Sequence, residues 1–244
     1  MLLQRLKSLG KKSAHRLGFD VRGLEHTEQG ILQSLLRRLQ PAAVLDVGAN
    51  VGQYARLVRA VGFAGPIISF EALESAHTAL TRAARHDREW CIAPCAALGG
   101  EAGTVEINVA SNSASSSILP STALLQQAAP QAAYVARQVT RCMRLDSYGA
   151  LPAAGKLYLK VDTQGFELEV LRGASALLPR LCAIQLELSL VPLYEGAPVM
   201  TDVIAHLGER GFDLFQLVPA FRDHRDGRLL QVEGFFLPRA AAVR

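Results

Sequence analysis

The segment Asp46–Gly52 (DVGANVG) has the residue types of a ligand-binding loop. An apolar run precedes it and residues with helical spacing follow it, so we expect it to join a strand to a helix. Gly48 lets the chain turn tightly beside a ligand, and Asn50 is a favourable helix N-cap. The spacing is not G-x-G-x-x-G, whose glycines admit a pyrophosphate. The pattern favours a ligand with a carboxylate and an amine but no phosphates; the alternative is an ordinary strand–helix turn.

A carboxylate ends the next apolar run, because Glu71 lies 19 residues after Gly52. An acidic residue about 20 residues beyond a glycine loop typically accepts hydrogen bonds from the ribose hydroxyls of an adenosine ligand. The alternative is a surface carboxylate at a strand end. The residues expected to bind an adenosine ligand are Asp46, Gly48, Ala49, Asn50, Gly52 and Glu71.

Polar residues also follow a later apolar run, at 160–167. Lys160 and Asp162 fall on the same face of a strand, because strand side chains alternate. Glu187 lies near the end of the next predicted strand, and ligands of open α/β sheets bind beyond the carboxyl ends of strands. We therefore expect Asp162 and Glu187 to lie near each other. Glu167 is explained equally well as a helix-start carboxylate.

Two carboxylates at the mouth of a sheet suit proton transfer. Asp162 and Glu187 are candidate general bases, and Lys160 either stabilises a developing alkoxide or pairs with a carboxylate. A divalent metal ion between the two carboxylates is an alternative, because it would lower the pKa of a bound hydroxyl. Ser111–Ser117 forms either part of the wall of an acceptor site or a flexible linker.

These residues come together only if the strands that carry them are parallel. Apolar runs alternate with helically spaced segments, and this order implies a parallel sheet with right-handed crossovers. The predicted main strands are 42–47, 66–71, 90–97 with its exit turn, 156–162 and 182–190. The predicted helices are 30–39, 51–61, 73–85, 167–178 and 199–210.

The middle of the chain is less regular. Residues 103–109 alternate in polarity like an added strand, and 138–144 has the pattern of another. Between them, 112–121 is a loop of small and polar residues. The stretch 122–137 is expected to be a short helical insertion that Pro130 interrupts.

The hydrophobic pattern changes again near the C-terminus. Residues 212–218 and 229–238 are predicted strands on either side of Asp226–Gly227, a strong tight-turn signal. An antiparallel pair often closes an otherwise parallel sheet. The patterns together predict an α/β fold with a mostly parallel seven-stranded sheet and an antiparallel C-terminal hairpin.

The distribution of charge limits the partners. The chain has 244 residues and a net charge of +4, and its basic excess lies in residues 1–22, where six lysines and arginines accompany Asp20 alone. A nucleic-acid enzyme usually carries its basic surface around the site, so we expect no nucleic-acid partner. Residues 1–22 are predicted either as a basic amphipathic helix at a membrane surface or as a packed or solvated extension.

Hydropathy and cysteine usage point to a cytoplasmic protein, with membrane association through residues 1–22 as the alternative. No apolar run reaches the roughly 18 residues of a membrane span, and the N-terminus lacks the pattern of a signal peptide. None of the four cysteines forms a C-x-x-C pair. We expect them to be buried and reduced.

Four segments in order, DVGANVG, FEAL, LKVDTQGFELEVLRGA and LELSLVPLYEG, resemble the FkbM-type methyltransferase family over roughly residues 42–237. The resemblance implies a Rossmann-like class I methyltransferase fold that uses S-adenosylmethionine. It also implies an O-methyltransferase for a hydroxyl of a sugar, glycoconjugate or natural product. Ala72 stands where the family commonly has proline. Gln164 stands where it often has glutamate, which weakens the argument for a metal site.

Under this interpretation, residues 1–30 form a basic extension and 31–244 the methyltransferase domain. The acceptor is expected to be a small molecule or carbohydrate, and nothing in the sequence sets an oligomeric state. The alternatives are an RNA, protein or phenol acceptor, or a non-catalytic cofactor-binding partner subunit. The absence of an N-P-P-[YF] stretch disfavours base methylation, and the intact glycine loop with Glu71 disfavours a non-catalytic role.

Overall fold

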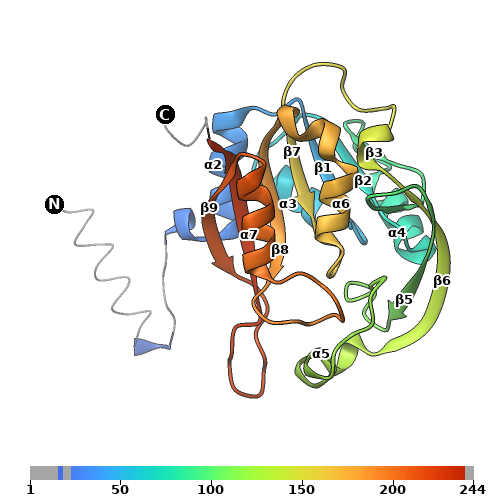
Figure 1. The fold of residues 1–244 in the computed structure, drawn as a ribbon. Coiled ribbons are helices and arrows are strands. Elements are labelled where there is room, and N and C mark those ends of the chain that lie inside the picture. The colour runs from blue at the N-terminus through green and yellow to red at the C-terminus, as the bar shows by residue number, and fades with distance from the viewer. Residues whose placement is uncertain (1–15, 19–22, 240–244) are drawn as a thin grey trace.

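The computed structural model describes residues 16–18 and 23–239, which contain a central seven-stranded sheet (Figure 1). The strand order is β3-β2-β1-β7-β8-β10-β9. The strands are β1 Ala43–Val47, β2 Ile67–Phe70, β3 Trp90–Ile92, β7 Leu157–Val161, β8 Leu181–Ser189, β9 Phe212–Pro219 and β10 Gln231–Pro238. Neighbours from β3 to β8 are parallel, whereas β10 is antiparallel to β8 and β9. The predicted sheet and its antiparallel C-terminal hairpin are confirmed.

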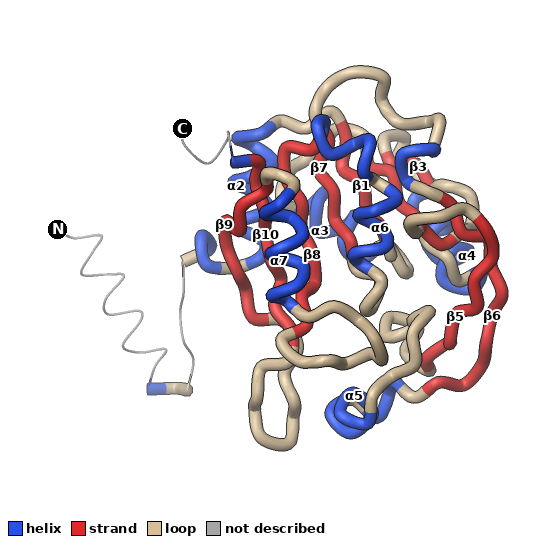
Figure 2. The backbone as a smooth tube through the Cα atoms, viewed as in Figure 1, coloured by secondary structure: helices blue, strands red, loops and turns tan. Residues whose placement is uncertain are grey.

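Helices cover both faces of this sheet (Figures 1 and 2). They are α2 Glu28–Leu39, α3 Gln53–Ala60, α4 Glu74–Ala84, α6 Glu167–Gly173 and α7 Met200–Glu209. The apolar faces of α2, α3 and α4 pack with Val44 and Tyr158 on one side, and those of α6 and α7 pack with Leu45 and Leu159 on the other. Every residue of β1 and β7 is buried, as expected for central parallel strands.

A second sheet of three strands stands beside the first, in the order β4-β6-β5. Its strands are β4 Ala97–Leu98, β5 Gly103–Ala110 and β6 Tyr134–Met143. The predicted strand 103–109 is therefore present, but in a sheet of its own. Residues 90–97 were predicted as a strand and its exit turn, and the structure has β3 followed by a turn. The chain then resumes as β4 in the second sheet. Pro94, which has no N–H, lies in the gap between β3 and β4.

The predicted helical insertion at 122–137 is only partly correct. The helix α5 Ala123–Ala128 and a 3₁₀ turn at Pro130–Ala132 occupy its first part. From Tyr134 onward the chain is β6, paired antiparallel along its length with β5. The pairing of β6 with β5 determines the secondary structure of this region, because contacts with a distant strand override the local helix propensity.

The C-terminal hairpin has a longer connection than a tight turn. Its strands end at Pro219 and begin at Gln231, and the Gly227 amide donates to the Asp223 carbonyl at 2.9 Å. Asp226–Gly227 therefore lies at the tip of a loop spanning 220–230. The loop reaches α5, since a ring nitrogen of His224 lies 2.8 Å from the Ala128 carbonyl oxygen.

Three expectations concern features outside the site: membrane-spanning helices, the basic N-terminal segment and the cysteines. No helix in the described residues is long and apolar enough to cross a membrane. The predicted basic helix at 1–22 lies outside the described residues except for 16–18. All four cysteines are free, and Cys142 and Cys182 are buried, but Cys91 is exposed, contrary to expectation.

Candidate active site

The loop after β1 turns through three residues in the left-handed region: Gly48, Asn50 and Gly52. A Cβ atom on Gly48 would overlap the carbonyl oxygen of Asp162, so this glycine allows the ends of β1 and β7 to touch. A Cβ on Gly52 would lie 2.6 Å from the Trp90 ring. The N-cap of α3 is Gly52, so the predicted N-cap role of Asn50 is wrong.

Glu71 ties this loop to the end of β2. One carboxylate oxygen accepts from the Asn50 amide at 2.7 Å, and the other accepts from the Ala72 and Leu73 amides at 2.9 and 2.7 Å. Burial raises the pKa of the Glu71 carboxyl, and these three amides oppose that shift. Ala72 therefore supplies a donor that a proline at the same position would lack.

Asp46 lies beneath the loop rather than on its surface. Its side chain is buried and accepts a hydrogen bond from the Ser69 hydroxyl at 3.0 Å. The Trp90 indole donates to the same hydroxyl at 2.9 Å. Burial raises the pKa of Asp46 to about 7, although the Ser69 hydrogen bond opposes the shift.

A cavity of about 230 Å³ opens between this loop, the end of β2 and the second sheet. The predicted binding residues Gly48, Ala49, Asn50 and Glu71 line it, whereas Asp46 and Gly52 do not. Apolar side chains form much of its wall: Val47, Phe70, Leu73, Leu98, Ile107, Ile118 and Phe166. Four residues of the segment 111–117, which was predicted as acceptor wall or linker, also line it: Ser113, Ala114, Ser116 and Ser117.

A second cavity of about 270 Å³ adjoins the first. Three residues line both cavities: Ala114, Asp162 and Gln164. The second cavity has walls from α5, the hairpin loop, β8, β10 and residues 112–115. Its remaining lining residues are Asn112, Ser115, Leu125, Ala129, Gln131, Glu187, Phe221 and Gln231.

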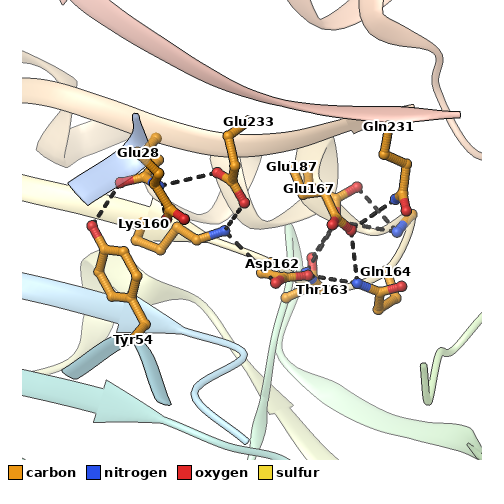
Figure 3. A network of polar contacts seen from close by, with 12 residues as sticks. Glu28, Tyr54, Lys160, Asp162, Thr163, Gln164, Glu167, Glu187, Gln231 and Glu233 are labelled. Carbon is orange, nitrogen blue, oxygen red and sulfur yellow. Dashed lines mark hydrogen bonds and ion pairs between the residues drawn. The ribbon is translucent and has the colours of Figure 1, made fainter. Parts of the chain in front are cut away.

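The structure brings Asp162 and Glu187 together around one amide (Figure 3). The Gln164 side-chain nitrogen donates to Asp162 at 2.6 Å and to Glu187 at 2.9 Å. The Tyr194 hydroxyl donates to the Gln164 side-chain oxygen at 2.6 Å, which fixes the orientation of the amide. Gln164 itself has a φ of 54°, an uncommon conformation for a non-glycine residue.

Glu187 is held from a second side by the Gln231 amide, which donates to it at 2.7 Å. Burial, and next the nearby Asp162 carboxylate, raise the pKa of Glu187 well above its ordinary value, with Lys160 opposing them. Both hydrogen bonds reach the same oxygen, Oε2. Among the described residues, no side chain or amide bonds to Oε1.

Lys160 is buried behind Asp162 and lines neither cavity. Its ammonium lies 3.2 Å from a Glu233 oxygen and 3.7 Å from an Asp162 oxygen (Figure 3). Burial favours the neutral amine, but the carboxylates of Glu233 and Asp162 outweigh it and raise the pKa of Lys160. The geometry therefore makes Lys160 a partner of carboxylates, which was one of the two roles expected for it.

The polar cluster around Gln185 was not predicted from the sequence. This buried amide donates to Glu28 at 2.8 Å and to Glu233 at 3.0 Å, and it accepts from the Tyr54 hydroxyl at 2.7 Å. Single polar residues inside the apolar strands β8 and β10 were the available signal, because a buried polar group requires a partner. Glu28, at the start of α2, carried no such signal.

Glu167 holds the loop after β7. Its carboxylate accepts from the Thr163 amide at 3.0 Å and from the Gly165 amide at 3.1 Å. It therefore has the helix-start role. As for a metal, no group of three or more His, Cys, Asp or Glu side chains in the described residues is arranged to hold an ion.

The sheet order with its antiparallel β10, and the cavity at the carboxyl ends of β1, β2 and β7, define a Rossmann-like α/β fold with a ligand site at the usual edge of its sheet. Residues 46–214 match the family model described as "Methyltransferase FkbM domain", and the chain belongs to this family.

Solved structures of methyltransferases resemble the chain at low identity. Precorrin-6y C5,15-methyltransferase from Geobacter metallireducens GS-15 has 12% identity and a TM-score of 0.46, with 89% of this chain and 92% of that chain covered. An rRNA methylase from Streptococcus thermophilus has 10% identity and a TM-score of 0.48, with 90% and 99% covered. No curated protein matches the chain.

Proposed function

We propose that this methyltransferase transfers a methyl group from S-adenosylmethionine to a hydroxyl of a sugar, glycoconjugate or natural product. The observation that carries the proposal is the position of Asp162, which lies on the wall of both cavities. A donor in the first cavity and an acceptor in the second would meet beside this carboxylate. We assign the activity to residues 31–244 and treat 1–30 as a basic extension.

The first cavity has the groups that S-adenosylmethionine requires. When bound, this cofactor supplies an electrophilic methyl group on a positively charged sulfur. The apolar wall suits an adenine ring, and the Glu71 carboxylate suits ribose hydroxyls. Gly48, Ala49 and Asn50 would border the ligand, whereas Asp46 and Gly52 support the loop from below.

Asp162 is the proposed general base. Asp162 would accept the proton of the acceptor hydroxyl as that oxygen takes the methyl group. A positioned base typically contributes about 10²–10⁴-fold to such a step. Gln164 and Lys160 hold Asp162 from two sides, at 2.6 and 3.7 Å.

Glu187 has a different proposed role. Its raised pKa keeps the carboxyl protonated over a wider pH range, which suits a hydrogen-bond donor to the acceptor rather than a base. A metal ion between Asp162 and Glu187 is disfavoured by Gln164. That residue directs an N–H donor at both carboxylates, where a metal would need an oxygen ligand.

The proposed acceptor is a small molecule or carbohydrate and not a nucleic acid, and the proposed location is the cytoplasm. The supporting observation is the confinement of the basic excess to residues 1–22. That segment is proposed to be a solvated or packed extension, with contact to a membrane surface as the alternative.

Methyl transfer from labelled S-adenosylmethionine to glycosides, lipid-linked sugars and total RNA tests the proposal. We expect an O-methyl ether on a glycoside or lipid-linked sugar and no label in RNA. Label in RNA alone would contradict the proposed acceptor while leaving the methyltransferase activity intact.

A further inference from the structure

The second cavity differs from the first in the chemistry of its walls. Side-chain amides and a hydroxyl supply most of its polar lining: Asn112, Ser115, Gln131, Gln164 and Gln231. Groups of this kind both donate and accept hydrogen bonds, as sugar and polyol hydroxyls do. No lysine or arginine lines this cavity in the part of the chain that the structure describes.

The acidic side chains of this cavity are engaged with neighbours. Asp162 accepts from Gln164 and lies near Lys160, while Glu187 accepts from Gln164 and Gln231 through Oε2. The Oε1 oxygen of Glu187 has no partner among the described residues and belongs to a side chain on the cavity wall. It is therefore available to a hydroxyl of the acceptor.

An apolar patch completes the cavity. Phe221, from the hairpin loop, packs with the cluster that contains Leu125 and Ala129. The hairpin loop is anchored to α5, because the Arg225 guanidinium donates to Gln127 at 2.7 Å and His224 contacts Ala128. The patch is thus fixed on the wall of the same cavity as the polar side chains, and an apolar surface of this kind suits the apolar face of a sugar ring.

We propose that the second cavity is the acceptor subsite and that it selects an uncharged, hydroxyl-rich ring over its anionic counterparts. This inference rests on the proposed function and names its acceptor class. An anionic group would face Asp162 with no cation on the wall to pair with it, and would lose hydration without compensation.

Matched pyranosides test the selection. Full-length protein is assayed with S-adenosylmethionine against methyl glucosides, galactosides and mannosides whose carbon 6 is either a hydroxymethyl or a carboxylate group. We expect kcat/KM to be at least tenfold higher for the neutral member in any series that is methylated. A carboxylate member that is used equally well overturns the inference but not O-methylation. No methylation of any member, by protein that binds the cofactor, overturns the sugar acceptor and this inference together.

Two variants locate the subsite. Gln131→Lys places a cation on the cavity wall and should raise kcat/KM for the carboxylate member at least fivefold relative to the neutral one. Gln216→Lys, on β9 and outside both cavities, is the control and should leave this ratio unchanged. An unchanged ratio in Gln131→Lys, with an unaltered melting temperature, would overturn the assignment.

A second pair of variants, one test and one control, examines the apolar patch. Phe221→Ala should raise KM for the neutral pyranoside about tenfold with kcat within threefold. Phe215→Ala, an exposed phenylalanine of β9, should change neither constant. A Phe221→Ala protein that melts like wild type and keeps its KM would show that the acceptor lies elsewhere.

Discussion

Gly48 and Asp162 pack against each other where β1 and β7 end, with no room for a Cβ atom between the glycine and the Asp162 carbonyl oxygen. This backbone contact holds the proposed cofactor loop, residues 46–52, beside the proposed base Asp162. The contact explains why the loop requires glycine here before any ligand is considered.

Gly48→Ala should destabilise the protein through both strain and overlap. A side chain in the left-handed region costs about 1–2 kcal/mol, and overpacking adds about 1–3 kcal/mol. Gly62→Ala is the control, because Gly62 has a φ of 93° but open space around it, so only the strain remains. Urea denaturation would measure both. Equal losses in the two variants would contradict the packing role of Gly48.

Glu71→Gln should weaken binding of S-adenosylmethionine. Hydrogen bonds to a charged group contribute about 1.5–3 kcal/mol, so the dissociation constant should rise about tenfold or more. Titration calorimetry would measure the affinity. Glu74→Gln, an exposed neighbour at the start of α4, should bind normally. Unchanged affinity in Glu71→Gln would remove Glu71 from the cofactor site.

Asp162→Asn should keep cofactor affinity and slow the chemical step by about 10²–10⁴-fold, because the base is lost while the shape is kept. Single-turnover methyl transfer would measure the step. Wild-type activity should survive exhaustive chelation. Activity lost on chelation and restored by a divalent ion would favour the metal alternative, and normal turnover by Asp162→Asn would remove Asp162 as the base.

Lys160→Met should cost about 3–5 kcal/mol of unfolding free energy at neutral pH, because removing the ammonium leaves the buried Glu233 carboxylate uncompensated. Glu233 and Asp162 would lose the ammonium that lies 3.2 and 3.7 Å from them. Lys156→Met, at an exposed lysine just before β7, should cost far less. Urea denaturation would measure the unfolding free energy of both variants. Similar losses in the two would contradict a structural ion pair.

Asp46 should make stability depend on pH. Burial raises its pKa from an ordinary 3.8 to about 7, so the native state holds a proton that the unfolded state releases between these values. The stability of wild type should therefore fall as pH rises from 4 through 7. Asp46→Asn should lose part of this decline, whereas Asp226→Asn, at the exposed hairpin tip, should retain it. Parallel pH profiles of wild type and Asp46→Asn would contradict the assignment.

Local patterns in the sequence determined much of the fold. The all-buried runs of β1 and β7 and the helical spacing of α3 and α4 depend on neighbours within one element. Asp162 directly follows β7 and Glu187 lies near the end of β8, and parallel strands end at the same edge. Their proximity therefore followed from chain order alone.

Only the tertiary structure decided what surrounds those carboxylates. Gln185 bonds to Glu28, 157 positions away along the chain, and Glu233 enters the cluster because β10 pairs antiparallel with β8. The extent of β6 and the walls of the second cavity likewise depend on contacts between distant segments. Side-chain periodicity reports which face of an element is buried, but not which distant element covers it, because that choice is set by packing of the whole chain.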